Sequence, residues 1–235
     1  MVEVIAFDAD DTLWENESLY HQAKGDFTQI LSSYRDPHWV IQKLDEIEVS
    51  NIRVYGYGIK SFTLSMIETA ADTVEGSIEA STIAAILEIA KGMLSAEVKL
   101  LDHSERALMQ LSPAYDLMLV TKGDLFEQQR KIARSGIAHY FKLIEVVAEK
   151  TPASYEGVLM KYRIDAERFM MVGNSLRSDI MPVLEIGGRA VYIPNEDTWF
   201  HEVPDQDDVT WAEFDELEHL GQLPGYIADL QHPKT

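Results

Sequence analysis

The fold is decided by residues 4–14, which read Val4-Ile5-Ala6-Phe7-Asp8-Ala9-Asp10-Asp11-Thr12-Leu13-Trp14. Residues 4–7 are apolar and predict a short buried strand. Asp8 comes where this strand ends, and an open α/β sheet binds its ligands just outside the carboxyl ends of its strands. Asp8 and Asp10 are two residues apart, so an extended backbone points both carboxylates the same way. They then repel each other unless a cation lies between them. The alternative is an ordinary turn, in which Asp and Thr are common.

The composition is that of a globular protein without cysteine chemistry. The chain has 235 residues, of which 46% are hydrophobic, and this suits one large domain or a core domain with an insert. The sequence has no cysteine, which excludes disulfides and thiolate metal sites. We find no secretion signal at the start and no apolar run long enough to cross a bilayer, so we expect a cytoplasmic protein.

The charge balance is strongly acidic. There are 40 acidic and 20 basic residues, which give a formal net charge of −20. Nucleic acid needs phosphate neutralisation by Lys and Arg, so this surface disfavours it, and it also repels anionic membranes. A small anionic substrate is still compatible, because a metal ion can reverse the local field. No pattern in the sequence indicates the oligomeric state.

Residues 15–96 follow a helical period. Apolar side chains recur at three- and four-residue steps in four successive segments, at 19–34, 37–47, 59–74 and 83–94. The run Tyr55-Gly56-Tyr57-Gly58 interrupts this period and predicts a loop. Four such helices in succession predict a small helical bundle.

After Lys99 apolar strands alternate with helices. Strands are predicted at 117–121, 143–148, 169–172 and 190–193, and a last helix at 211–220. This alternation implies a parallel sheet covered on both faces by helices. The simplest architecture is an α/β core of residues 1–14 and 99–235, with residues 15–98 inserted as a helical domain.

Polar residues follow four of these strands. They are Asp8 and Asp10 after the first, Thr121, Lys150, and the run from Asn174 to Asp179. The carboxyl ends of parallel strands meet at one edge of the sheet, so these side chains are expected to converge there.

The chain here strongly resembles the haloacid dehalogenase superfamily. The matching pieces are FDADDTLW, LMLVTKGD, the lysine of VVAEKTP, and MVGNSLRSDI, in the family's order and spacing. The resemblance covers residues 1–14 and 99–195. It implies a Rossmann-like parallel-sheet core, and the helical block resembles the family's four-helix cap, inserted directly after the first motif.

The resemblance implies a role for each strand-end residue. Asp8 would be a nucleophile that attacks phosphorus to give an aspartyl-phosphate. Asp10 would be the general acid for the leaving group and then the base that activates water. Thr121 would donate a hydrogen bond to a phosphoryl oxygen, and Lys150 would neutralise charge on the phosphate. Lys122 is a candidate for a neighbouring phosphate contact, but the safer alternative is a solvated surface lysine.

The resemblance also implies a Mg²⁺ site. Its ligands would be Asp8, the backbone carbonyl of Asp10, and Asp179, with Asn174 beside them. Phosphatases of the superfamily usually carry Asp where this chain has Asn174. An amide can still offer a carbonyl oxygen to a hard cation, but without charge, so we expect weaker Mg²⁺ affinity.

These expectations combine into a Mg²⁺-dependent phosphatase that acts on a small phosphorylated metabolite. Superfamily members that hydrolyse carbon–halogen bonds lack the acid at the position of Asp10 and need no metal, so Asp10 and Asp179 together favour phosphate. One alternative is a catalytically weak relative that binds a phosphorylated ligand or a protein partner, which Asn174 would suit. A phosphomutase, which shares all four motifs, is another.

Overall fold

The fold is taken from a computed structural model, which describes residues 2–74, 76–199, 202 and 214–231. Its contacts divide the chain into two compact units. The sheet unit contains residues 1–17, 98–122 and 128–235, and the helical unit contains residues 18–97 and 123–127. The sequence predicts that all of residues 99–235 belong to the core, whereas residues 123–127 belong to the helical unit in the structure.

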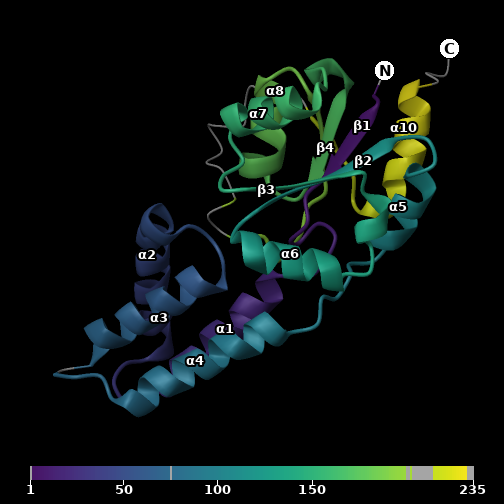
Figure 1. The fold of residues 1–235 in the computed structure, drawn as a ribbon. Coiled ribbons are helices and arrows are strands. Elements are labelled where there is room, and N and C mark those ends of the chain that lie inside the picture. Colours follow the sequence, from purple (N-terminus) through teal and green to yellow (C-terminus); the bar gives the residue numbers. More distant parts are fainter. Residues whose placement is uncertain (1, 75, 200–201, 203–213, 232–235) are drawn as a thin grey trace. The chain divides into compact units, whose positions relative to one another are not determined.

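In the described residues the sheet unit is built on six parallel strands in the order β3-β2-β1-β4-β5-β6. Figure 1 labels β1, β2, β3 and β4. The strands are β1 (Val4–Phe7), β2 (Asp116–Lys122), β3 (Leu143–Val147), β4 (Phe169–Gly173), β5 (Arg189–Tyr192) and β6 (Asp215–Glu216). This confirms the predicted α/β parallel sheet. Phe7 pairs with Leu119 of β2 on one side and with Val172 of β4 on the other. Asp8 therefore follows the central strand at the carboxyl edge of the sheet.

Both faces of the sheet are buried, which is why its strands are continuously apolar. Ile5 and Phe7 point into a cluster with two helices, α5 (Ser104–Leu111) and α10 (Leu223–Gln231). Val4 and Ala6 point into a second cluster with α7 (Pro152–Tyr162) and α8 (Met181–Glu185). The alternation of these four residues follows the period of two in a strand. β1 is thus fixed from both faces and from both neighbouring strands.

The helices of the core begin in different ways, two of them at local signals that the sequence carries. They are α5 (Ser104–Leu111), α6 (Leu125–Arg134), α7 (Pro152–Tyr162), α8 (Met181–Glu185) and α10 (Leu223–Gln231). Thr151 and Ser154 form a reciprocal capping box at α7, with Pro152 in the first turn, and Asp124 Oδ1 accepts the Glu127 N–H at 3.0 Å. Among the helices in the described ranges, none is both long and apolar enough to span a membrane.

The predicted helix at 211–220 is wrong where the structure describes it. Residues 215–216 form β6, which pairs with β5, and the Leu217 N–H donates to the Tyr192 carbonyl at 3.0 Å. The edge of β5 offers unpaired backbone groups, and pairing them outweighs local helix propensity. The helix begins later, as α10 at Leu223, and residues 211–213 lie outside the described residues.

The helical unit contains the four predicted helices, α1 (Glu17–Ile30), α2 (Pro37–Tyr55), α3 (Ile59–Thr73) and α4 (Ala80–Ser95). They share one buried cluster that includes Phe27, Leu44, Phe62 and Ile86. Residues 123–127 join this unit because Glu127 Oε2 accepts the Ile59 N–H at 2.9 Å and thus caps α3.

Two residues of α3 test how much of the stability of this unit comes from its buried cluster. Phe62 is 1% exposed, whereas Leu64 on the same helix is 43% exposed. We expect Phe62→Ala to lower the free energy of unfolding by about 3–5 kcal/mol, because it leaves a cavity. Leu64→Ala, the control, should change it by no more than about 0.5 kcal/mol. Urea denaturation followed by circular dichroism measures both, and equal losses would contradict this packing.

Candidate active site

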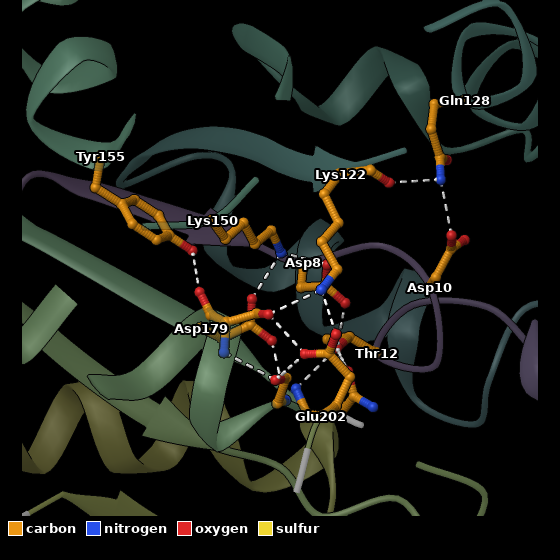
Figure 2. Close-up of polar contacts among 12 residues, drawn as sticks. Asp8, Asp10, Thr12, Lys122, Gln128, Lys150, Tyr155, Asp179 and Glu202 are labelled. Carbon is orange, nitrogen blue, oxygen red and sulfur yellow. Dashed lines mark hydrogen bonds and ion pairs between the residues drawn. The ribbon is translucent and has the colours of Figure 1, made fainter. Parts of the chain in front are cut away.

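The centre of the site is a buried lysine held between two buried carboxylates (Figure 2). Lys150 Nζ lies 2.5 Å from Asp8 Oδ1 and 2.6 Å from Asp179 Oδ1. Asp8 follows β1, Lys150 follows β3, and Asp179 lies in the π-helical turn Leu176–Ile180 after β4. The topology therefore brings together three residues that the sequence had predicted to converge.

One ammonium group serves two carboxylates, and the pKa values reflect this. Burial raises the pKa of Asp179 to about 7; the charge of Lys150 lowers it only in part, and Asp8 raises it further. Burial opposes the charged form of Lys150, but the two carboxylates raise its pKa above the ordinary value, so it stays protonated. The group of three has a formal charge of −1, and a further cation would stabilise it.

Thr12 connects Asp8 to the predicted metal-site residue Asn174. The Thr12 hydroxyl lies 2.9 Å from Asp8 Oδ2 and 3.1 Å from Asn174 Oδ1, and it accepts the Asn174 backbone N–H at 3.1 Å. The amide Nδ2 of Asn174 donates to Thr198 Oγ1 at 3.2 Å. Asn174 therefore lies one hydroxyl away from Asp8 and directs its carbonyl oxygen towards that hydroxyl.

Asp10 has partners entirely different from those of Asp8. Lys131 Nζ lies 2.6 and 2.7 Å from its two carboxylate oxygens, and Gln128 Nε2 donates to Oδ2 at 2.8 Å. The Trp14 indole N–H donates to Oδ1 at 2.6 Å. Burial raises the pKa of Asp10, but the charge of Lys131 and these hydrogen bonds outweigh it and hold the pKa below the ordinary value. Asp8 and Asp10 thus pair with different ammonium groups, those of Lys150 and Lys131.

The third acid of the opening stretch has a structural position. Asp11 has φ of +61° and its carboxylate accepts the backbone N–H groups of Asn16, at 2.9 Å, and Glu17, at 3.1 Å. Glu17 is the first residue of α1 and Asn16 precedes it, so Asp11 satisfies part of the open end of that helix. Burial raises the pKa of Asp11 to about 7.

The end of β2 contributes the remaining predicted residues. Thr121 is buried, and Lys122 Nζ donates to Ser178 Oγ at 2.9 Å and pairs with Glu202. The alternative of a solvated Lys122 is therefore wrong: its ammonium group lies within the cluster of polar strand-end residues. The reason is the buried carboxylate of Glu202, which the sequence did not place near this strand.

Glu202 is an unexpected member of the site. Its Oε2 accepts hydrogen bonds from Ser175 Oγ at 2.5 Å and Ser178 Oγ at 2.6 Å, and its Oε1 pairs with Lys122 (Figure 2). Burial raises the pKa of Glu202, but the charge of Lys122 and the two hydroxyl hydrogen bonds outweigh it and lower the pKa to about 2.

Some of the missed residues had a signal in the sequence. Gln128 lies four residues before Ile132, which is buried in the core, so it occupies the inward face of α6. A polar residue on such a face is a candidate site residue, and Lys131 lies on the same face, three residues after Gln128. Glu202 had no such signal, because it follows no strand and belongs to no repeated pattern.

The oxygen donors of the site fit a magnesium ion. In the part of the chain that the structure describes, no three His, Cys, Asp or Glu side chains are grouped closely enough to hold a metal alone. Mg²⁺ does not require such a group, because it is usually bound by one or two carboxylates together with waters and substrate phosphate. Asp8 and Asp179 supply two carboxylates, and the excess negative charge around Lys150 favours a cation.

Comparison with known proteins agrees with this architecture. The family model for haloacid dehalogenase-like hydrolases matches residues 2–187. The chain belongs to this family. A haloacid dehalogenase-like hydrolase from Xanthomonas campestris is 40% identical, with a TM-score of 0.85 over 97% of this chain and 91% of that chain. A search of curated protein sequences gives no match.

More distant structures share the fold but carry different activities in their names. A 2-haloacid dehalogenase from Pseudomonas syringae is 19% identical, with a TM-score of 0.63 over 98% of this chain and 100% of that chain. A predicted phosphoglycolate phosphatase from Haemophilus somnus is 16% identical, with a TM-score of 0.64 over 96% and 98%. The chain is thus a hydrolase of this family, and the choice between these reactions must come from its own residues.

The central lysine can be tested by stability. We expect Lys150→Met to lower the free energy of unfolding by about 3–5 kcal/mol at pH 7.5, because it leaves two buried carboxylates without a counter-charge. Lys142→Met is the matched control, since the exposed pair of Lys142 with Asp116 should contribute no more than about 1 kcal/mol. Urea denaturation measures both, and a loss below about 1 kcal/mol for Lys150→Met would contradict this arrangement.

The pH dependence of stability tests the contacts of Glu202. Its pKa is about 2 in the folded protein and near 4.5 when unfolded, so its stabilisation is present above pH 4.5 and is lost as the pH falls towards 2. We expect the free energy of unfolding of the wild type, measured by urea denaturation, to exceed that of Glu202→Gln by about 3 kcal/mol at pH 6. This difference should shrink below pH 4.5. A difference that does not change between pH 6 and pH 3 would contradict the ion pair.

Proposed function

We propose that the protein is a Mg²⁺-dependent hydrolase that removes phosphate from a small phosphorylated metabolite through an aspartyl-phosphate on Asp8. The observation that carries this proposal is the sharing of Lys150 between Asp8 and Asp179. A carboxylate is a poor nucleophile towards an anionic phosphate until cations screen the repulsion. Lys150 supplies one positive charge, and the excess negative charge around it favours a second one.

In the first step an oxygen of Asp8 attacks phosphorus, and the bond from phosphorus to the ester oxygen breaks. Lys150 neutralises charge on Asp8 and on the phosphoryl oxygens, and the Thr121 hydroxyl donates a hydrogen bond to one of them. Asp10 gives a proton to the leaving oxygen, so that the alcohol departs uncharged.

In the second step water attacks phosphorus and the bond to Asp8 breaks. Asp10 takes a proton from the water, inorganic phosphate leaves, and the Asp8 carboxylate is restored. Its contacts with Lys131, Gln128 and Trp14 keep Asp10 ionised, which is the form that a base requires. For the acid step Asp10 must take up a proton, and its ion pair with Lys131 must then break. We therefore assign the contact with Lys131 to the ionised form of Asp10.

The metal would be held by Asp8, Asp179 and the backbone carbonyl of Asp10, with Asn174 beside them. Bound there, Mg²⁺ would supply positive charge to the phosphoryl oxygens and orient them. Because Asn174 brings no charge, we expect this site to bind Mg²⁺ more weakly than a site with a third carboxylate.

One observation favours carbon–halogen hydrolysis as a second candidate. Asp10 is held by Lys131 away from the partners of Asp8, and the departure of a halide requires no proton. Asp8 would then attack carbon and release the halide, and water would hydrolyse the resulting ester. The water needs a base, and Asp179 beside Asp8 can take its proton, but this reaction gives Asp10 no leaving group to protonate, which is why we place it after phosphate transfer.

A substrate panel separates the two reactions. We expect inorganic phosphate to be released from some small phosphate esters only when Mg²⁺ is present, and no halide from 2-haloacids. Asp8→Asn should reduce the rate by more than about 10³-fold, because it removes the nucleophile. Asp26→Asn, a change at an exposed acid of α1, is the matched control and should leave the rate unchanged. Halide release that needs no metal would overturn the proposal.

A further inference from the structure

The contacts of Glu202 connect two strands on opposite sides of the strand that carries Asp8. Lys122 ends β2, while Ser175 and Ser178 follow β4, and β1 lies between these two strands. Lys122 Nζ nevertheless lies 2.9 Å from Ser178 Oγ, so the bridge crosses the carboxyl end of β1. Asp8 follows β1 directly, and the carboxylate of Glu202 is bound to this bridge (Figure 2).

The groups around Glu202 are arranged as a receptor for a carboxylate. Ser178 Oγ accepts from Lys122 and Ser175 Oγ accepts from the Ser178 N–H at 2.9 Å, so the proton of each hydroxyl is directed to Glu202. Together with the ammonium group, three donors meet one carboxylate, which is about nine-tenths buried. Donors held in place by other bonds bind an anion at little cost in reorganisation.

The chain itself supplies the anion for this receptor, because Glu202 neutralises the positive charge of Lys122. The side chains of Asp8, Asp179 and Glu202 carry three negative charges, and Lys122 and Lys150 carry two positive ones. Without Glu202 the same group would be neutral, and the carboxylate of a ligand could take the place of Glu202 beside Lys122 and the two serines. With Glu202 a second anion on the substrate meets a negative charge and finds its donors taken.

We propose that Lys122, Ser175 and Ser178 form a carboxylate-binding subsite, that Glu202 fills it, and that Glu202 thereby selects against substrates with a second anionic group. The inference deepens the proposed function and rests on it for its substrate class. The preferred substrates are monophosphate esters whose remaining part is neutral or cationic. If Glu202 only held the chain in place, replacing it would change the stability of the protein but not its preference among substrates.

Two phosphate esters of nearly equal size test the selection. Glycerol 3-phosphate ends in a neutral hydroxymethyl group, whereas 3-phosphoglycerate has a carboxylate there. We expect the wild type to favour glycerol 3-phosphate, and Glu202→Gln to shift the ratio of kcat/KM towards 3-phosphoglycerate by at least about tenfold. Glu105→Gln, at an exposed position of α5, is the control and should leave the ratio unchanged. A shift below about threefold in Glu202→Gln would overturn the proposal.

A binding measurement tests the subsite without any turnover. Glu202→Ala leaves the three donors without their carboxylate, so sodium acetate should raise its melting temperature saturably, beyond sodium chloride at equal ionic strength. The wild type and the double variant Glu202→Ala with Lys122→Ala should respond equally to both salts. If sodium acetate and sodium chloride change the melting temperature of Glu202→Ala equally, the proposed subsite is overturned.

The substrate ratio and the acetate response distinguish a failure of the proposed function from a failure of the carboxylate-binding subsite. If the wild type hydrolyses no phosphate ester, the proposed function fails, and the acetate measurement still decides whether the subsite exists. If esters are hydrolysed but neither the substrate ratio nor the acetate response changes, the function stands and the role of Glu202 is overturned. If Glu202→Ala does not fold, the substrate ratio of Glu202→Gln decides alone.

Discussion

The site depends on the placement of one buried ammonium group between two buried carboxylates. Lys150 can hold Asp8 and Asp179 only because β1, β3 and β4 end at the same edge of a parallel sheet. Burial makes this contact strong and also makes it incomplete, because two negative charges face a single positive one. The remaining negative charge favours a cation electrostatically, and the proposed phosphate transfer relies on this charge balance.

A second set of contacts surrounds this centre and controls its charge. Lys131 and Gln128 of α6 hold Asp10 as a carboxylate, and Lys122 with two serines holds Glu202. Asp10 and Glu202 thus have donors of their own, whereas Asp8 and Asp179 share Lys150 and still repel each other. Asp11 is excluded from the site altogether and caps α1 instead.

The sequence predicted those parts of the molecule that follow from local pattern and sheet topology. The convergence of Asp8, Lys150 and Asp179 could be predicted because each follows an apolar strand of a parallel sheet. The partners of Asp10 could not, because hydrogen bonds to a side chain depend on rotamers and on the packing of α6. Glu202 and β6 were missed because long-range pairing, not local propensity, decides the position of both.

The most direct test of the account is to trap the covalent intermediate. Wild-type protein is mixed with Mg²⁺ and a phosphate ester that it hydrolyses, quenched in acid during turnover, digested, and analysed by mass spectrometry. We expect a phosphoryl group on Asp8 that hydroxylamine removes, as it does from an acyl phosphate. Phosphate release without modification of Asp8, or a phosphoryl group on another residue, would contradict it.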